Sequence, residues 1–170
     1  MINFEQYLAE RSPVAKDKLP EKPPLFYTYF DILSKVIKDL SQFNCDLVNN
    51  RMNIFQNVEF TTQILMFPAP IGRVSGNFDA SGIGLTSLQN GPTEVDGDFD
   101  VSKNKLTDLE YAPTQVRGSV YLSSNRLTTL EGDLETIGGD MTIRLQHTKN
   151  FTKDDVSKYK ISVAGRVYYK

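Results

Sequence analysis

The sequence has few of the residues on which metal, redox or nucleophilic chemistry most often depends. Its 170 residues include one cysteine, Cys45, and one histidine, His147. A single cysteine excludes a disulfide framework and a cysteine-based zinc site. We interpret Cys45 as a small buried hydrophobe and His147 as a surface or turn residue. We therefore predict no catalytic residue, no cofactor and no metal site, and we expect a protein that is not an enzyme.

The sequence also lacks a strong charge and a long apolar run. The formal net charge is −2 and the pI is about 5.4, so electrostatics give no reason to expect nucleic acid or an anionic membrane as the partner. No apolar run approaches the length of a membrane span, and the stretch MINFEQYLAERS has neither the basic nor the apolar region of a signal peptide. We expect a cytoplasmic protein, long enough for one domain with a substantial core.

A repeat with a 21-residue period is the main feature of the sequence. The stretches VSGNFDASGIGLTSL, VDGDFDVSKNKLTDL, VRGSVYLSSNRLTTL and IGGDMTIRLQHTKNF begin at Val74, Val95, Val116 and Ile137. A fixed period of this size is typical of a solenoid. Apolar residues alternate within each copy, which is the pattern of a strand with one buried face. The predicted parallel strands cover residues 76–81, 97–102, 118–123 and 139–144.

The acidic residues of the second copy could be taken for a calcium loop. Asp96, Asp98 and Asp100 occupy alternate positions, but the sixth and twelfth positions counted from Asp96 hold Val101 and Thr107. A calcium loop of the helix-loop-helix kind needs glycine and glutamate there. The aspartates are therefore assigned to the solvated face of a strand. On such a face nothing would separate the pKa values of Asp98 and Asp100, as a hydrolase dyad requires.

Two other repeat positions predict how each copy turns and packs. Asn104 and Asn125 follow their strands, and their amides are expected to bond the backbone of the turn in a ladder along the solenoid. The first and fourth copies hold Ile83 and Gln146 at this position, so the ladder is expected only in the middle copies. A pair of inward leucines then follows in three copies, at Leu85 and Leu88, Leu106 and Leu109, and Leu127 and Leu130.

The spacing of Val120, Leu122, Asn125 and Leu127 resembles the core segment of a leucine-rich repeat. It departs from that family in having glycine two residues before the strand and Glu-x-x-Pro after the second leucine. This variant, S-x-N-x-L-T-x-L-E, resembles the short repeats of small accessory proteins of large T4-like tailed phages.

The resemblance implies an α/β solenoid, a short right-handed coil of parallel strands. It also implies a non-catalytic protein-binding module, a phage accessory protein that binds and inhibits a host factor in the host cytoplasm. That factor would be a toxin or another component of anti-phage defence. The alternatives are a minor structural or assembly protein of a virion and a bacterial leucine-rich-repeat effector.

The ends of the chain are predicted to cap the solenoid. Residues 1–46 form a helical N-terminal cap, with helices at 3–10 and 24–43 and an exposed strap rich in proline and lysine at 12–24. Residues 47–170 form the solenoid, whose C-terminal cap at 152–170 is a short helix started by Thr152 and a final strand. The stretch 45–52 fits the repeat only in part, as a strand of another connection or by coincidence.

The outward side chains of the strands form the candidate protein-binding site. They make columns on a concave face that is acidic in the early copies and contains tyrosine and arginine in the later ones, and these two residue types are common at interface hot spots. We expect a basic partner surface, and we expect changes to Asp98, Asp100, Tyr121 or Arg144 to have little effect on folding, against the alternative of a merely solvated sheet. The predicted residues are Asn77, Asp79, Asp96, Asp98, Asp100, Arg117, Tyr121, Asp140 and Arg144.

Overall fold

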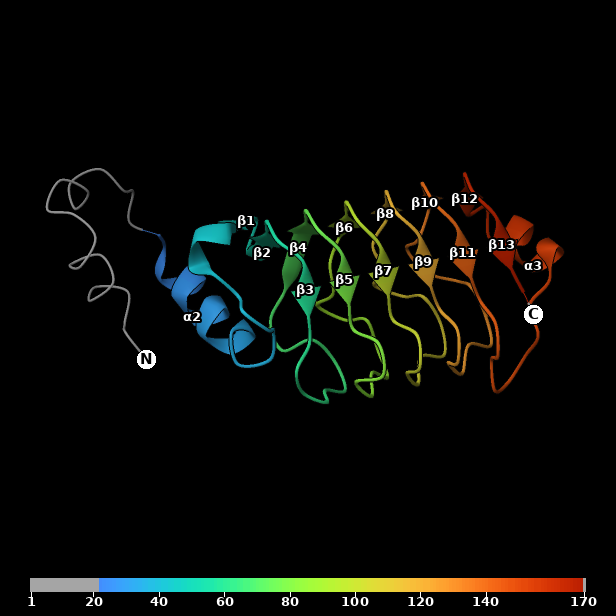
Figure 1. Cartoon of the computed structure of the whole chain (residues 1–170), viewed down its shortest axis with the longest axis horizontal. Coiled ribbons are helices and arrows are strands. Elements are labelled where there is room, and N and C mark those ends of the chain that lie inside the picture. The colour runs from blue at the N-terminus through green and yellow to red at the C-terminus, as the bar shows by residue number, and fades with distance from the viewer. Residues whose placement is uncertain (1–21, 170) are drawn as a thin grey trace, which may run out of the picture.

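The computed structural model describes residues 22–169, which wind into a solenoid with a step of 21 residues along the repeats. Figure 1 shows the coils stacked side by side, with one helix at each end of the stack. The predicted fold of stacked parallel strands between a helical N-terminal end and a C-terminal helix and strand is confirmed. The helix expected at 3–10 and most of the strap at 12–24 lie outside the described residues.

Each repeat contributes two short strands, and these belong to two different sheets. The six-stranded sheet contains β3 (Val58–Glu59), β5 (Phe78–Asp79), β7 (Phe99–Asp100), β9 (Val120–Tyr121), β11 (Met141–Thr142) and β13 (Val167–Tyr168). The seven-stranded sheet contains β1 (Cys45–Val48), β2 (Arg51–Ile54), β4 (Ile71–Val74), β6 (Glu94–Val95), β8 (Gln115–Val116), β10 (Thr136–Ile137) and β12 (Ser162–Val163). Every pairing is parallel except that of β1 with β2.

The predicted strands were in the right place but too long. Residues 97–102 contain only β7, and the preceding strand β6 was missed. The chain passes from one sheet to the other at the corner 96–98, where a Cβ on Gly97 would overlap the Asn77 side chain. Glycine therefore recurs at the corners because the preceding coil approaches too closely for a side chain.

The core consists of the inward side chains of both sheets and of the return loops. The six predicted leucines are buried, with 0–2% of their surface exposed. Phenylalanines fill the first coils, and the ring centroids of Phe78 and Phe99 on adjacent strands lie 5.5 Å apart. The fourth copy has Thr148 and Phe151 at the positions of the leucine pair, and there Phe151 is buried whereas Thr148 is exposed. The predicted core positions are confirmed.

A buried ladder of amide side chains holds the turns after the six-stranded sheet. Asn125 Oδ1 accepts from the backbone N–H of Leu106 at 3.1 Å, and its Nδ2 donates to carbonyl oxygens of its own and the preceding coil. Asn104 binds in the same way, as predicted. The expectation that the ladder occurs only in the middle copies was wrong, because Gln146 of the fourth copy also joins it. Its Nε2 donates to Leu122 O at 2.8 Å. The longer glutamine side chain reaches the same backbone groups.

The N-terminal segment covers both sheet edges at its end of the solenoid. Helix α2 (Pro24–Leu33) ends ten residues before the predicted boundary at 43. Beyond it, Ile37 forms an antiparallel bridge with Phe60, and the short 3-10 helix η1 (Gln42–Asn44) follows. The helix is interrupted because these backbone groups pair with the outer edge of β3.

The stretch 45–52 is part of a hairpin that covers the other sheet edge. Strands β1 and β2 pair antiparallel across a two-residue turn, in which Asn49 and Asn50 have φ values of 51° and 58°. Asparagine is the non-glycine residue that tolerates this left-handed backbone best. The first interpretation, a strand of another connection, is therefore correct.

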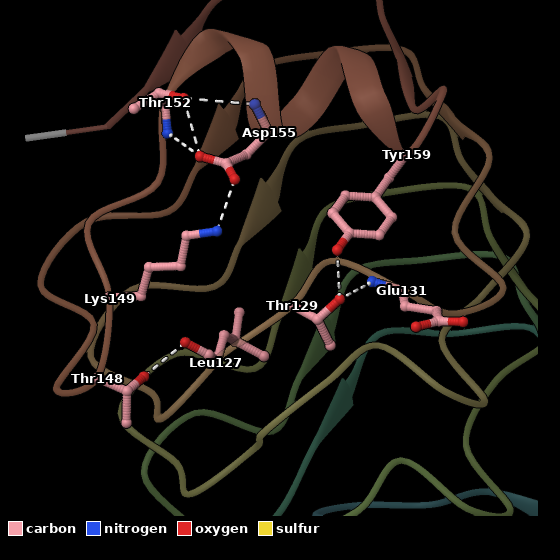
Figure 2. A network of polar contacts seen from close by, with 8 residues as sticks. All are labelled: Leu127, Thr129, Glu131, Thr148, Lys149, Thr152, Asp155 and Tyr159. Carbon is pink, nitrogen blue, oxygen red and sulfur yellow. Dashed lines mark hydrogen bonds and ion pairs between the residues drawn. The ribbon is translucent and has the colours of Figure 1, made fainter.

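The C-terminal cap contains the predicted helix, but two short strands replace the single predicted final strand. Helix α3 (Lys153–Lys158) begins at Thr152, whose hydroxyl accepts from the backbone N–H of Asp155 while the Asp155 carboxylate accepts from the backbone N–H of Thr152. Lys149 Nζ lies 2.6 Å from the same carboxylate, and the Thr129 hydroxyl donates to the Tyr159 hydroxyl (Figure 2). The cap is thus fixed to the solenoid by polar contacts on both sides of the helix. Strands β12 and β13 then extend the two sheets.

Candidate protein-binding face

The outward positions of the six-stranded sheet form one column, which we call the strand column. Strand register places its residues on neighbouring strands about 4.8 Å apart. None of them is buried. The column is acidic over its first three positions and carries two tyrosines over its last three. Its members are Glu59, Asp79, Asp100, Tyr121, Thr142 and Tyr168.

The carboxylates of the strand column have fixed positions. Asp79 Oδ1 accepts from the backbone N–H of Ser81 at 2.9 Å, and Asp100 Oδ1 accepts from that of Ser102 at 2.8 Å. Glu59 is paired with Lys38 at 3.0 Å, but both side chains are more than half exposed. Like charges directly opposite each other in a sheet are destabilising. A cation in contact with the acidic half of the column would therefore reduce the repulsion between its carboxylates.

The other half of the strand column contains two tyrosines, and the basic residue Arg144 lies beside it. Tyr121 and Tyr168 are half-buried, and the Arg144 guanidinium lies 5.1 Å from the centroid of the Tyr168 ring. This contact is of the cation–π kind and reduces the freedom of both side chains. The backbone N–H of Arg144 also donates to Ser123 Oγ at 3.1 Å. The structure thus brings the predicted Arg144 and Tyr121 to the same end of the face.

The corner column, one residue after each corner glycine, belongs to the scaffold. Asn77 Oδ1 accepts from the backbone N–H of Asp98 at 2.9 Å, and Asp98 Oδ1 accepts from that of Ser119 at 2.7 Å. Ser119 and Asp140 continue the series to the backbone N–H of Arg166. Each of these side chains satisfies a backbone donor of the next coil, so Asp98 has a structural role that its expected small effect on folding did not include.

The remaining predicted residues, Asp96 and Arg117, form an ion-pair group with Arg73. Asp96 accepts three hydrogen bonds from Arg73, the shortest of which joins Nη2 to Oδ2 at 2.8 Å. Arg117 Nη1 lies 3.2 Å from Asp96 Oδ1. The Asp96 side chain is 19% exposed. Its carboxylate therefore joins three neighbouring coils, while the side chains of Arg73 and Arg117 are 42% and 54% exposed.

Two members of these groups escaped the sequence analysis. Glu59 continues the strand column. Val58 and Phe60 on either side of it precede Phe78 and Ala80 by 20 residues, so the repeat spacing could have identified Glu59. Arg73 lies on β4, a strand that the alternation pattern did not reveal. Its partner Asp96 is 23 residues away, so no in-register comparison of repeats pairs the two.

The residues with reactive side chains lie apart from this face. Cys45 is buried on β1, where its thiol donates to Ser41 O at 3.3 Å, and burial raises the pKa of the thiol to about 12. His147 is exposed in the turn of the last repeat. Within residues 22–169, no group of three or more histidine, cysteine, aspartate or glutamate side chains could hold a metal ion. The helices in this range are all too short or too polar to cross a membrane.

Comparisons with protein-family models, with curated proteins and with solved structures found no significant match to this chain.

Proposed function

We propose that this protein is a non-catalytic binding module that recognises another protein through the strand column. The observation that carries the proposal is the division of this in-register column into an acidic half and a half with two tyrosines, one of which contacts Arg144. Tyrosine and arginine supply the anchors that dominate many interfaces, and carboxylates steer a basic partner during approach. The resemblance of the repeats to phage accessory proteins extends the proposal to a bacterial host factor as the partner.

The structure narrows the set of residues assigned to recognition. Asn77, Asp98 and Asp140 hold backbone groups of the next coil, so we assign them to the scaffold. Recognition is assigned to Asp79, Asp100, Tyr121, Tyr168 and Arg144, with Glu59 at the N-terminal end. These side chains combine exposure with a backbone that neighbouring coils keep fixed, which lowers the entropy lost on binding.

The test uses neutral substitutions that preserve the local structure. The double variant Asp79→Asn and Asp100→Asn removes two charges but keeps the Oδ1 acceptors for Ser81 and Ser102. The control, Glu131→Gln and Glu135→Gln, changes the net charge equally at exposed positions away from the column. Each protein is used to capture partners from a bacterial lysate, and binding kinetics with the recovered protein are then measured.

A stoichiometric partner whose association slows in the Asp79/Asp100 variant, but not in the control, would support the proposal. Tyr121→Ala should instead speed dissociation, as the loss of an anchor does. Wild-type rates in all variants would refute the strand column as the binding surface. Recovery of the chain itself as the main partner would favour the alternative of a structural or assembly protein.

A further inference from the structure

A groove with a basic lining lies on the turns that follow the six-stranded sheet. Its volume is about 410 Å³. The lining contains four side chains that are cationic or can become so, and it contains no carboxylate. The residues are Gln63, Gly82, Gly84, Lys103, Asn104, Lys105, Ser124, Arg126 and His147.

The repeat places the basic groups of the groove in register. Lys105, Arg126 and His147 are separated by 21 residues each, so they recur once per coil, about 4.8 Å apart. Their backbone N–H groups donate to carbonyl oxygens of the preceding coil at 2.8, 2.9 and 3.0 Å. Lys103 lies beside this row in a left-handed turn position with φ 57°. The bases of these side chains are therefore held by the scaffold.

The positive charges of the groove have no counter-charge in the described part of the chain. The ion pairs of residues 22–169 involve Lys35, Lys38, Arg73, Arg117 and Lys149, and none includes a groove residue. By contrast, the ion-pair group on the other sheet places Asp96 between two arginines. A row of like charges on adjacent coils is destabilising, and an anion bound along the row would relieve the repulsion.

The shape and lining of the groove favour an acidic protein segment over other anions. No phenylalanine, tyrosine or tryptophan lines it, so it lacks the large aromatic side chains on which nucleobases most often stack. Carboxylates on one face of a helix or strand recur about every 5–7 Å, close to the spacing of cations on successive coils. Two glycines at the first coil, Gly82 and Gly84, leave that end open, and a Cβ on Gly82 would meet nothing within 4 Å.

We propose that this groove, built by Lys103, Lys105, Arg126 and His147, binds an acidic segment of a partner protein. The site is distinct from the strand column and has the opposite charge. The proposal for this groove does not depend on whether the strand column binds a protein. A partner with separate basic and acidic regions could contact both surfaces at once.

The experiment measures binding of a fluorescent, glutamate-rich synthetic peptide to the full chain by anisotropy. The reference peptide has glutamine in place of each glutamate. The groove variant is Lys105→Glu with Arg126→Glu, and a matched control, Lys153→Glu with Lys160→Glu, changes the net charge equally at exposed positions of the C-terminal cap. Both groove side chains are exposed, so folding should persist, and Lys105→Gln with Arg126→Gln offers a milder second variant.

The groove variant is expected to bind the acidic peptide at least about tenfold more weakly than the wild type, and the control within about twofold. The glutamine peptide should not bind. The proposal would be overturned by equal losses in the groove and control variants, or by a wild type that does not bind the acidic peptide at physiological salt. If inorganic phosphate displaced the acidic peptide when present at the same concentration as the peptide, the result would overturn the proposal in favour of a phosphate site. A single-stranded oligonucleotide that binds more tightly than the peptide would overturn it in favour of nucleic acid.

Discussion

The amide ladder leads to a prediction about the stability lost when Asn104 or Asn125 is replaced by alanine. The two asparagines differ in how many backbone groups depend on them for a hydrogen bond. Asn125 is fully buried, whereas Asn104 is 6% exposed. Burial alone predicts that Asn125→Ala lowers the free energy of unfolding at least as much as Asn104→Ala. The hydrogen bonds predict that Asn104→Ala lowers it more.

Truncation of Asn125 leaves one backbone group without a partner. Its Nδ2 donates to the carbonyl oxygens of Val101 and Leu122, but the neighbouring ladder residues also donate to both oxygens. Only the N–H of Leu106 loses its acceptor. Because one buried unsatisfied group costs about 1–3 kcal/mol, Asn125→Ala should lower the free energy of unfolding by about that amount.

Among the described residues, truncation of Asn104 removes the only hydrogen-bond partner of three backbone groups. Its Oδ1 accepts from the N–H groups of Gly84 and Leu85 at 2.9 and 3.0 Å, and its Nδ2 donates to Ala80 O at 2.8 Å. Gly84 is only half-buried, so water can replace part of the loss. Asn104→Ala should therefore cost about 2–5 kcal/mol, more than Asn125→Ala.

Urea unfolding followed by circular dichroism measures both variants against the wild type. The same atoms are removed in each case, so the cavity contribution is similar and the difference reports the unpaired backbone groups. An Asn125→Ala variant that loses as much stability as Asn104→Ala, or more, would refute this reasoning. Burial rather than backbone satisfaction would then set the cost.

Three further predictions concern single positions. Gly118→Ala should lower the melting temperature more than Gly82→Ala does. A Cβ on Gly118 would lie 2.6 Å from Gly97 O, whereas a Cβ on Gly82 would meet no atom within 4 Å and only the φ of 66° opposes it. Cys45, whose burial raises its pKa to about 12, should react with a thiol reagent at neutral pH only after denaturant is added; rapid reaction of the native protein would contradict its buried position. Hydrogen bonds from Lys149 and Thr152 lower the pKa of Asp155 from 3.8 to about 2, so its stabilising effect is complete above pH 3.8 and is lost as the pH falls through about 2. The difference in melting temperature between wild type and Asp155→Asn should therefore shrink over that range, and a constant difference would argue against the capping contacts.

The sequence alone determined the period, the inward positions and the capping of the C-terminal helix. Each of these depends on residues that recur at a fixed spacing or lie within one turn of each other, as Leu106 and Leu109 or Thr152 and Asp155 do. Such short-range patterns reflect burial and local hydrogen bonding directly. The amide ladder was also predictable, because an asparagine after a buried strand must serve the backbone of the turn.

Only the tertiary structure showed which polar side chains are free to meet a partner. Asp98 and Asp100 are two residues apart and look equivalent in the sequence, yet Asp98 accepts from the backbone of the next coil and Asp100 only from its own. The corner between the two sheets makes this difference, because it directs the backbone N–H of Ser119 towards Asp98. The basic groove likewise arises when residues 21 apart are stacked at the spacing of adjacent strands. Contacts between coils depend on distances that no local pattern specifies, so the structure had to decide them.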